Sequence, residues 1–360
     1  MPHQTDDLRI RQTRPLIAPG ILMEELPLSA KAAAFVARSR RAIESILQGE
    51  DRRLLVVVGP CSIHDPEAAV EYARKLAEVN RALSKRLLIV MRVYFEKPRT
   101  VVGWKGLIND PFLDGSFQIN PGLRLARKLL LDVAAIGLPA GTEFLDTVLG
   151  QFFADLISWG AIGARTTESQ VHRELASGLS MPVGFKNRTD GDIQTAIDAI
   201  RAAAHPHWFP SLTKEGAPAV LGTSGNPFCH LVLRGGSESG PNFDAPSVEA
   251  AAGRLREAGL PGRIMVDCSH ANSGKDPARQ VFVAEAVARQ IADGSPSVAG
   301  VMIESHLKGG RQDLKRGRKV VYGQSITDGC LAFEDTVPLL ERLAEAVAQG
   351  RFGRNSRAKV

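Results

Sequence analysis

Four side chains of the kinds that bind metal ions occur at or near the ends of short apolar runs, although they lie far apart in the sequence. They are Cys61, His270, Glu304 and, just beyond the last run, Asp328. A thiolate, an imidazole nitrogen and two carboxylate oxygens suit a borderline divalent ion such as Mn²⁺, Fe²⁺, Co²⁺ or Zn²⁺ better than Ca²⁺. Taken singly, each has a structural explanation: a cysteine after a buried strand is more often an inert core residue, and Glu304 could pair with a cation. Taken together, the four favour a metal site.

Cationic side chains occur at the same kind of position. They are Arg92, Lys97, Arg165, Lys186 and Arg234. Gathered at one place they would repel one another unless an anion neutralised them, and the arginine fork matches phosphate and carboxylate oxygens. The alternative, that they are solvated surface charges, does not explain why they recur beside apolar runs. The sequence therefore predicts a small substrate with several negative charges, with phosphate as the favoured group.

Eight β-rich apolar runs alternate with helical segments from about residue 53 onward. The runs are 54–62, 87–95, 139–146, 159–167, 182–187, 230–236, 263–270 and 298–305. Segments with helical spacing lie at 66–83, 121–136, 191–203, 247–258 and 279–292. Continuous apolar runs suit strands that are buried on both faces. Eight strand–helix repeats predict an α/β fold, a closed (β/α)8 TIM barrel, more readily than an open doubly wound sheet.

Such a barrel places catalytic groups at the C-terminal ends of its strands and in the loops that follow. The metal-ligand candidates and the cations fall in these places, and so does Glu143 in the third run. The residues alone therefore predict a metal-dependent barrel enzyme that acts on small anionic substrates. They do not identify the reaction that the enzyme catalyses.

The barrel accounts for residues 53–350, and three segments are additional. Residues 1–52 form an N-terminal extension with a helical segment at 29–47. Two short apolar runs, 208–213 and 219–223, are too close for a helix to join them, so a β-hairpin insertion is expected at about 207–224. The last helix is expected at 334–348, followed by a basic tail at 351–360.

Composition excludes several classes of protein. Lysine and arginine exceed aspartate and glutamate by 45 − 39 = 6 over 360 residues, without a basic stripe, so dedicated nucleic-acid binding is not expected. Four cysteines are too few for a disulfide framework and indicate reduced thiols in a cytoplasmic protein. No apolar run approaches about 18 residues, so no membrane-spanning helix is expected, and the N-terminus lacks the pattern of a secretory signal.

Several motifs resemble those of type I 3-deoxy-D-arabino-heptulosonate 7-phosphate (DAHP) synthases. They are GPCSIHDP at 59–66, MRVYFEKPRTVVGWKGLINDP at 91–111, GAIGARTTESQVHRELASG at 160–178, LRGG at 233–236, DCSHAN at 267–272 and SITD at 325–328. The resemblance covers nearly the whole chain. It implies a (β/α)8 barrel with an N-terminal extension and an added hairpin. It also implies a metal-dependent condensation of phosphoenolpyruvate with erythrose 4-phosphate and water, which gives DAHP and phosphate in the first step of the shikimate pathway.

The resemblance also assigns site residues. It implies metal ligation by Cys61, His270, Glu304 and Asp328. It implies phosphoenolpyruvate binding by Arg92, Lys97, Lys105, Gly163, Ala164, Arg165, Lys186 and Arg234. It implies erythrose 4-phosphate binding by Arg99, Thr100 and Asp328. Catalytic roles are expected for Lys97, Glu143, Arg165, Lys186 and Arg234, with Lys97 or a metal-bound water as the proton donor and Glu143 as the hypothetical activator of the attacking water.

Feedback inhibition by an aromatic amino acid is a further implication of the resemblance. The expected effector positions are Asp6, Asp7, Gly150, Gln151, Ser180, Phe209, Ser211 and Leu221. Ser211 is similar to the phenylalanine- and tryptophan-responsive branches, which favours one of those two effectors. The same resemblance implies a homodimer or homotetramer, and it implies that the N-terminal extension at residues 1–52 serves regulation and assembly.

Two departures from the family pattern stand out. Arg188 replaces a usual glycine after Lys186, and the segment 236–243 is longer than usual, as in a lengthened surface loop. Two other functions compete with the interpretation. One is a synthase for an eight-carbon sugar acid phosphate, which would use arabinose 5-phosphate. The other is a catalytically silent protein that binds an aromatic amino acid.

Overall fold

Eight parallel strands close into a barrel in this computed structural model, which describes residue 3, residues 5–314 and residues 319–357, with side chains described up to residue 350. The barrel strands are β1 (Leu54–Gly59), β2 (Leu87–Arg92), β3 (Ala140–Glu143), β4 (Ile157–Ile162), β5 (Val183–Lys186), β8 (Cys229–Leu233), β9 (Ile264–Asp267) and β10 (Val298–His306). β1 pairs with β2 on one side and with β10 on the other. This last pairing closes the ring, so the predicted TIM barrel is confirmed and an open sheet is excluded.

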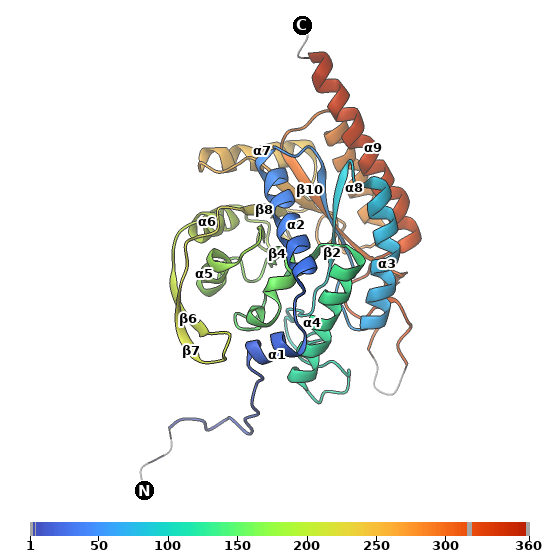
Figure 1. Cartoon of the computed structure of the whole chain (residues 1–360). Coiled ribbons are helices and arrows are strands. Elements are labelled where there is room, and N and C mark those ends of the chain that lie inside the picture. Colours follow the sequence, from blue (N-terminus) through green and yellow to red (C-terminus); the bar gives the residue numbers. More distant parts are fainter. Residues whose placement is uncertain (1–2, 4, 315–318, 358–360) are drawn as a thin grey trace.

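Helices surround the barrel and follow its strands along the chain (Figure 1). They are α3 (Pro66–Leu83), α4 (Ile119–Ile136), α5 (Gln170–Gly178), α6 (Gln194–Ala203), α7 (Ala245–Glu257), α8 (Arg279–Ala292) and α9 (Phe333–Arg357). Their starts follow local chemistry: Asp65 accepts from the N–H groups of Glu67 and Ala68 at the start of α3, and Asp244 caps α7 in the same way. Two short 3₁₀ turns, η1 (Leu149–Phe152) and η2 (Ala154–Leu156), lie between β3 and β4.

The N-terminal extension contains α1 (Pro19–Glu25) and α2 (Ala30–Gln48). From α2, Ile43, Ile46 and Leu47 join a buried cluster with inward-facing barrel residues such as Trp159 and Met302. Burial of these side chains fills one end of the barrel with apolar groups. The extension therefore belongs in part to the barrel core, which its sequence alone did not indicate.

An antiparallel hairpin interrupts the alternation between α6 and β8. It consists of β6 (Trp208–Leu212) and β7 (Pro218–Gly222), and it runs along α5 and α6 at the edge of the molecule (Figure 1). The predicted hairpin is confirmed.

The last helix differs from its prediction. The helix α9 begins near the expected residue but continues to Arg357, so residues 351–357 extend the helix instead of starting a tail. The remainder of the expected tail, residues 358–360, lies outside the described residues. Short strands follow β10: β11 (Lys308–Arg311) pairs with β12 (Gln324–Ser325), and β13 (Leu331–Ala332) pairs with the end of β10. Within the described part of the chain, no helix is both long and apolar enough to cross a membrane.

Candidate active site

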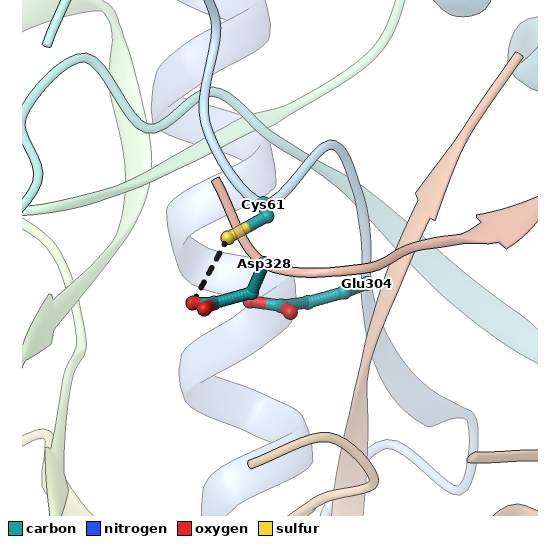
Figure 2. Close-up of side chains that lie close together, drawn as sticks. All are labelled: Cys61, Glu304 and Asp328. Atoms are coloured by element: carbon teal, nitrogen blue, oxygen red, sulfur yellow. Dashed lines mark hydrogen bonds between the residues drawn. The ribbon is translucent and has the colours of Figure 1, made fainter. Parts of the chain in front are cut away.

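Three of the four expected metal ligands gather at the C-terminal mouth of the barrel. One ligand atom each from Cys61, Glu304 and Asp328 lies within 4.8 Å of the others (Figure 2). Cys61 follows β1, Glu304 lies in β10, and Asp328 lies in the segment between β12 and β13. The pairing of Gly59 with Glu304 across β1 and β10 brings the first two together. Closure of the barrel therefore brings Cys61 close to Glu304, although the two residues are more than 240 positions apart in the sequence.

The cluster suits a divalent cation. Burial raises the pKa of the Cys61 thiol to about 12, and the Glu304 carboxylate contributes in the same direction. A bound metal ion reverses this effect, because a coordinating thiol gives up its proton. One sulfur and two carboxylate oxygens form the mixed donor set that borderline metals prefer. The residues present fit such an ion.

His270, the fourth expected ligand, lies outside this 4.8 Å group among the described residues. It lines a small cavity together with Glu304 and Asp328. Its backbone has a φ of 55°, a left-handed conformation that is uncommon for a residue other than glycine. The structure thus places His270 beside the cluster, with its imidazole Nδ1 2.9 Å from Asp267 Oδ2.

Lys97 contacts two of the cluster residues. Its Nζ atom lies 2.8 Å from Cys61 Sγ and 3.3 Å from Asp328 Oδ2. Burial disfavours the ammonium group, but the neighbouring Cys61, Glu304 and Asp328 raise the pKa of Lys97 overall. Lys97 in turn lowers the pKa of the Asp328 carboxyl below its usual range. Lys97 therefore stays protonated among the groups that would hold the metal.

Arg92 forms a buried ion pair with the same cluster. Its Nη2 donates to Glu304 Oε1 at 3.1 Å, and neither side chain is more than 2% exposed. The guanidinium also donates to the carbonyl oxygens of Pro60 and Cys61. Arg92 thus fixes Glu304 and the chain around Cys61 together.

The remaining cations surround the mouth at different depths. Arg234 is buried and Arg165 is exposed. Burial lowers the pKa of Arg234, the Asp267 carboxylate opposes this, and the charge of Arg165 adds to the decrease. Arg165 donates to the carbonyl of Pro98 and to Thr100 Oγ1, both at 3.3 Å. This contact brings the loop that carries Arg99 and Thr100 next to Arg165.

Lys105 and Arg99 are exposed at the same loop, and the Lys105 carbonyl accepts a hydrogen bond from the Lys97 N–H.

Arg188, which replaces a usual glycine of the family pattern, forms two ion pairs. Its guanidinium lies 2.7 Å from Glu168 and 2.8 Å from Asp190. Arg188 thereby joins the loop after β4 to the loop after β5.

Glu143 ends β3 and packs against the turn after β4. A Cβ atom on Gly163 would collide with Glu143 Oε1, so any other residue there would displace the Glu143 carboxylate from its present position. The Gly163 carbonyl accepts from the N–H groups of Thr166 and Thr167, which turns the chain so that Ala164 and Arg165 reach the mouth. Glu143 is 9% exposed.

Two buried acids at this mouth were not among the expected site residues. Asp267 ends β9 and accepts a hydrogen bond from Lys186 Nζ at 2.8 Å. Burial opposes its ionisation, yet Lys186 and His270 hold the pKa of Asp267 well below its usual range. Glu96 precedes Lys97, and burial together with Asp146 and Glu143 raises its pKa to about 8. The signal for Asp267 was present, because a charged residue closes an otherwise apolar run.

The expected effector residues fall into two groups. Phe209 and Leu221 face each other across the hairpin, with Ser211 on the same strand as Phe209. Lys214, in the turn of the hairpin, donates from Nζ to the carbonyl of Gln151 in η1, and its own carbonyl accepts from the Gly20 N–H. Hairpin, η1 and the start of α1 are therefore joined.

The other effector positions lie apart from that junction. Asp6 and Asp7 are exposed in the N-terminal segment. Ser180 is exposed shortly after α5, whose Ser177 forms a hydrogen bond with Thr223 at the base of the hairpin.

Comparisons with known proteins agree with this geometry. Residues 25–341 match the DAHP synthetase I family. The chain belongs to this family. It is 58% identical over 351 residues to the phospho-2-dehydro-3-deoxyheptonate aldolase of Escherichia coli K12 named Phe-sensitive, a match that covers 98% of this chain and 100% of that one. It is 55% identical over 345 residues to the Trp-sensitive protein of Escherichia coli O157:H7, covering 96% and 99%.

A solved structure shows the same fold. The phospho-2-dehydro-3-deoxyheptonate aldolase of Francisella tularensis SCHU S4 is 53% identical, superposes with a TM-score of 0.92, and covers 94% of this chain and 99% of its own. The family predicted from the motifs is thus confirmed, and the chain is an enzyme of the DAHP synthase family.

Proposed function

We propose that this chain condenses phosphoenolpyruvate with D-erythrose 4-phosphate and water to give DAHP and inorganic phosphate. The observation that carries the proposal is the convergence of Cys61, Glu304 and Asp328 around Lys97 at one mouth of the barrel. Cations suited to phosphate and carboxylate groups surround this cluster. A metal site next to an anion site suits a reaction in which a phosphorylated aldehyde is activated beside a second phosphorylated substrate.

Cys61, His270, Glu304 and Asp328 would hold the divalent ion, with Mn²⁺, Fe²⁺, Co²⁺ and Zn²⁺ as the candidates. When bound, the ion supplies Lewis-acid polarisation of the aldehyde oxygen of erythrose 4-phosphate. Asp328 also faces that sugar, and Arg99 and Thr100 bind its phosphate. The hydrogen bond from Arg165 to Thr100 supports neighbouring sites for the two substrates, because it joins a residue of one proposed set to a residue of the other.

Phosphoenolpyruvate is bound by Arg92, Lys97, Lys105, Arg165, Lys186 and Arg234, with the backbone of Gly163 and Ala164. The cationic side chains hold its phosphate and carboxylate while carbon 3 attacks the aldehyde carbon. Attack leaves carbon 2 with oxocarbenium character, and water adds there. The resulting hemiketal phosphate then expels phosphate by cleavage of the C–O bond.

Proton transfer falls to two residues. Lys97 is protonated and lies within the cluster, so it donates to the developing alkoxide of the aldehyde oxygen. Glu143 lies against Gly163 at the same mouth and accepts the proton of the attacking water.

We assign regulation to the region around the junction of the hairpin, η1 and the start of α1. We propose that phenylalanine or tryptophan binds beside this junction, at Gly150, Gln151, Phe209, Ser211 and Leu221 within it and at Asp6, Asp7 and Ser180 outside it. The relatives named Phe-sensitive and Trp-sensitive support an aromatic effector. The protein acts in the cytoplasm as a homodimer or homotetramer, and the exposed Trp208 and Val220 of the hairpin offer apolar surface for assembly.

A substrate assay tests the proposal. Phosphoenolpyruvate consumption is followed with erythrose 4-phosphate and with arabinose 5-phosphate, each with and without phenylalanine, tyrosine or tryptophan. Turnover with the four-carbon sugar and inhibition by phenylalanine or tryptophan support the proposal. Preference for the five-carbon sugar would identify the eight-carbon acid synthase instead, and binding of an amino acid without metal binding or turnover would identify a sensor.

A further inference from the structure

Asp267 connects the proposed metal site with the proposed substrate site through one oxygen atom. Its Oδ2 atom lies 2.8 Å from Lys186 Nζ and 2.9 Å from His270 Nδ1. Lys186 ends β5, whereas His270 follows β9, so two separate strands contribute to this contact. Asp267 has no exposed surface, and Lys186 is 3% exposed.

The second oxygen of Asp267 is also occupied. Oδ1 accepts from the Ser269 N–H at 3.0 Å and from Ser269 Oγ at 2.5 Å. The backbone carbonyl of Asp267 accepts from Asn272 Nδ2 at 2.9 Å. Four donors therefore hold the carboxylate in place, and it cannot bind a metal ion itself without losing one of them.

These contacts determine how His270 presents its imidazole. The imidazole Nδ1 also lies 2.7 Å from Ser269 Oγ, whose hydroxyl hydrogen is already donated to Asp267 Oδ1. Both neighbours of Nδ1 therefore accept, so Nδ1 carries the hydrogen and Nε2 keeps the lone pair that a metal ion needs. The left-handed backbone of His270 is fixed by a hydrogen bond from the Lys275 N–H to the His270 carbonyl at 2.7 Å. Side chain and backbone are thus both held before any metal binds.

We propose that Asp267 is a positioning residue that couples metal binding at His270 to substrate binding at Lys186, an inference that rests on the proposed function. A carboxylate partner fixes the orientation of a ligating histidine and makes its other nitrogen a better ligand. Lys186 neutralises the same carboxylate. When a substrate anion binds Lys186, the anion offsets the positive charge of Lys186, so Lys186 neutralises the Asp267 carboxylate less. The carboxylate then makes His270 a stronger metal ligand, and metal binding is strengthened. By thermodynamic reciprocity, the metal strengthens substrate binding by the same factor.

The first test measures metal affinity without substrate or turnover. Co²⁺ is titrated into the chelated protein, and the absorbance of the Cys61 thiolate–metal bond is recorded. Asp267→Asn keeps the shape of the side chain but removes its charge, and we expect Co²⁺ to bind about 10- to 100-fold more weakly. Unchanged Co²⁺ affinity in Asp267→Asn would overturn the proposal.

A second pair of variants removes the risk of misfolding, because Asp267→Asn leaves Lys186 as a buried charge without its partner. Lys186→Met is compared with the double variant Lys186→Met/Asp267→Asn, in which both charges are gone. The double variant should bind Co²⁺ about 10-fold or more weakly than Lys186→Met alone. Equal affinities in these two proteins would contradict a role for Asp267 in holding His270.

Asp155→Asn serves as the matched control. Asp155 pairs at 2.7 Å with Arg127, a fully buried arginine in the helix α4 that is not one of the proposed site residues. This variant should lower the melting temperature and leave Co²⁺ affinity unchanged, which separates a loss of stability from a loss of positioning. If Asp155→Asn lost as much Co²⁺ affinity as Asp267→Asn, the loss in Asp267→Asn would reflect reduced stability alone, and the proposal would be overturned.

Coupling is measured by repeating the titration with phosphoenolpyruvate present. We expect phosphoenolpyruvate to tighten Co²⁺ binding by about 5-fold or more in the wild type, and by less in Asp267→Asn. An equal shift in both proteins would overturn the coupling. Wild-type turnover, measured separately, decides the proposed function, so a wild type that binds Co²⁺ without turnover would refute that function and leave the Co²⁺ comparison intact.

Discussion

The Nζ atom of Lys97 lies 2.8 Å from the Sγ atom of Cys61. This distance joins the loop after β2 to the residue that follows β1, at the point where Asp328 also approaches. An ammonium group at this place stabilises a thiolate and can give a proton to an oxygen bound beside it. The contact therefore links the metal-binding chemistry of the cluster to the acid chemistry of the reaction.

Lys97→Met should abolish most of the turnover. The variant keeps the length of the side chain but has no proton to donate, and loss of a general acid costs about 10²- to 10⁴-fold in kcat. Steady-state kinetics under saturating metal measures the effect. Lys128→Met, which removes an exposed lysine paired with Asp132 on α4, is the control and should retain wild-type kcat. Wild-type kcat in Lys97→Met would exclude Lys97 as the acid.

Gly163→Ala should displace Glu143 and reduce turnover by at least about 10-fold, because the new methyl group would collide with Glu143 Oε1. Glu143→Gln should lower kcat as well, since the amide cannot accept the proton of water. The matched control is Gly253→Ala in α7, where the added Cβ meets nothing within 4 Å. That control should keep full activity and gain about 1 kcal/mol of stability, because alanine favours the helix. Equal activity of the two alanine variants would contradict the packing role of Gly163.

Glu96→Gln should change how stability depends on pH. Burial raises the pKa of Glu96 from its ordinary value of 4.5 to about 8 in the folded protein. Between these values the folded state binds more protons than the unfolded state, so Glu96 lowers the free energy of unfolding as pH rises from 4.5 to 8. Melting temperatures of wild type and Glu96→Gln should therefore agree best near pH 5, with the variant more stable near pH 9. A difference in melting temperature between the two proteins that stays constant from pH 5 to pH 9 would contradict a raised pKa for Glu96.

Sequence reasoning reached the barrel because its signals are local. Runs such as 54–62 and 298–305 are apolar over their whole length, and their number and alternation with helices decide the fold. The same reasoning brought Cys61, Glu304 and Asp328 together, since strand ends must meet at one mouth. The hairpin was predictable because its two runs are too close to hold a helix.

Contacts between distant side chains were not predictable in this way. Nothing in the pattern around Asp267 indicates that Lys186, 81 positions earlier, donates to it, and nothing around Glu96 indicates its burial beside Asp146. The end of the last helix was also predicted wrongly, since the helix expected at 334–348 continues to Arg357. Tertiary packing overrides such local signals.

One measurement tests the central claim most directly. DAHP formation from phosphoenolpyruvate and erythrose 4-phosphate is measured before chelation, after chelation, and after Mn²⁺ is added back, in the wild type and in Cys61→Ser. The account predicts that chelation abolishes turnover, that Mn²⁺ restores it in the wild type, and that Cys61→Ser recovers far less, because the hydroxyl is a weaker ligand than the thiolate. Turnover that survives complete chelation would contradict a metal-dependent site at Cys61, Glu304 and Asp328.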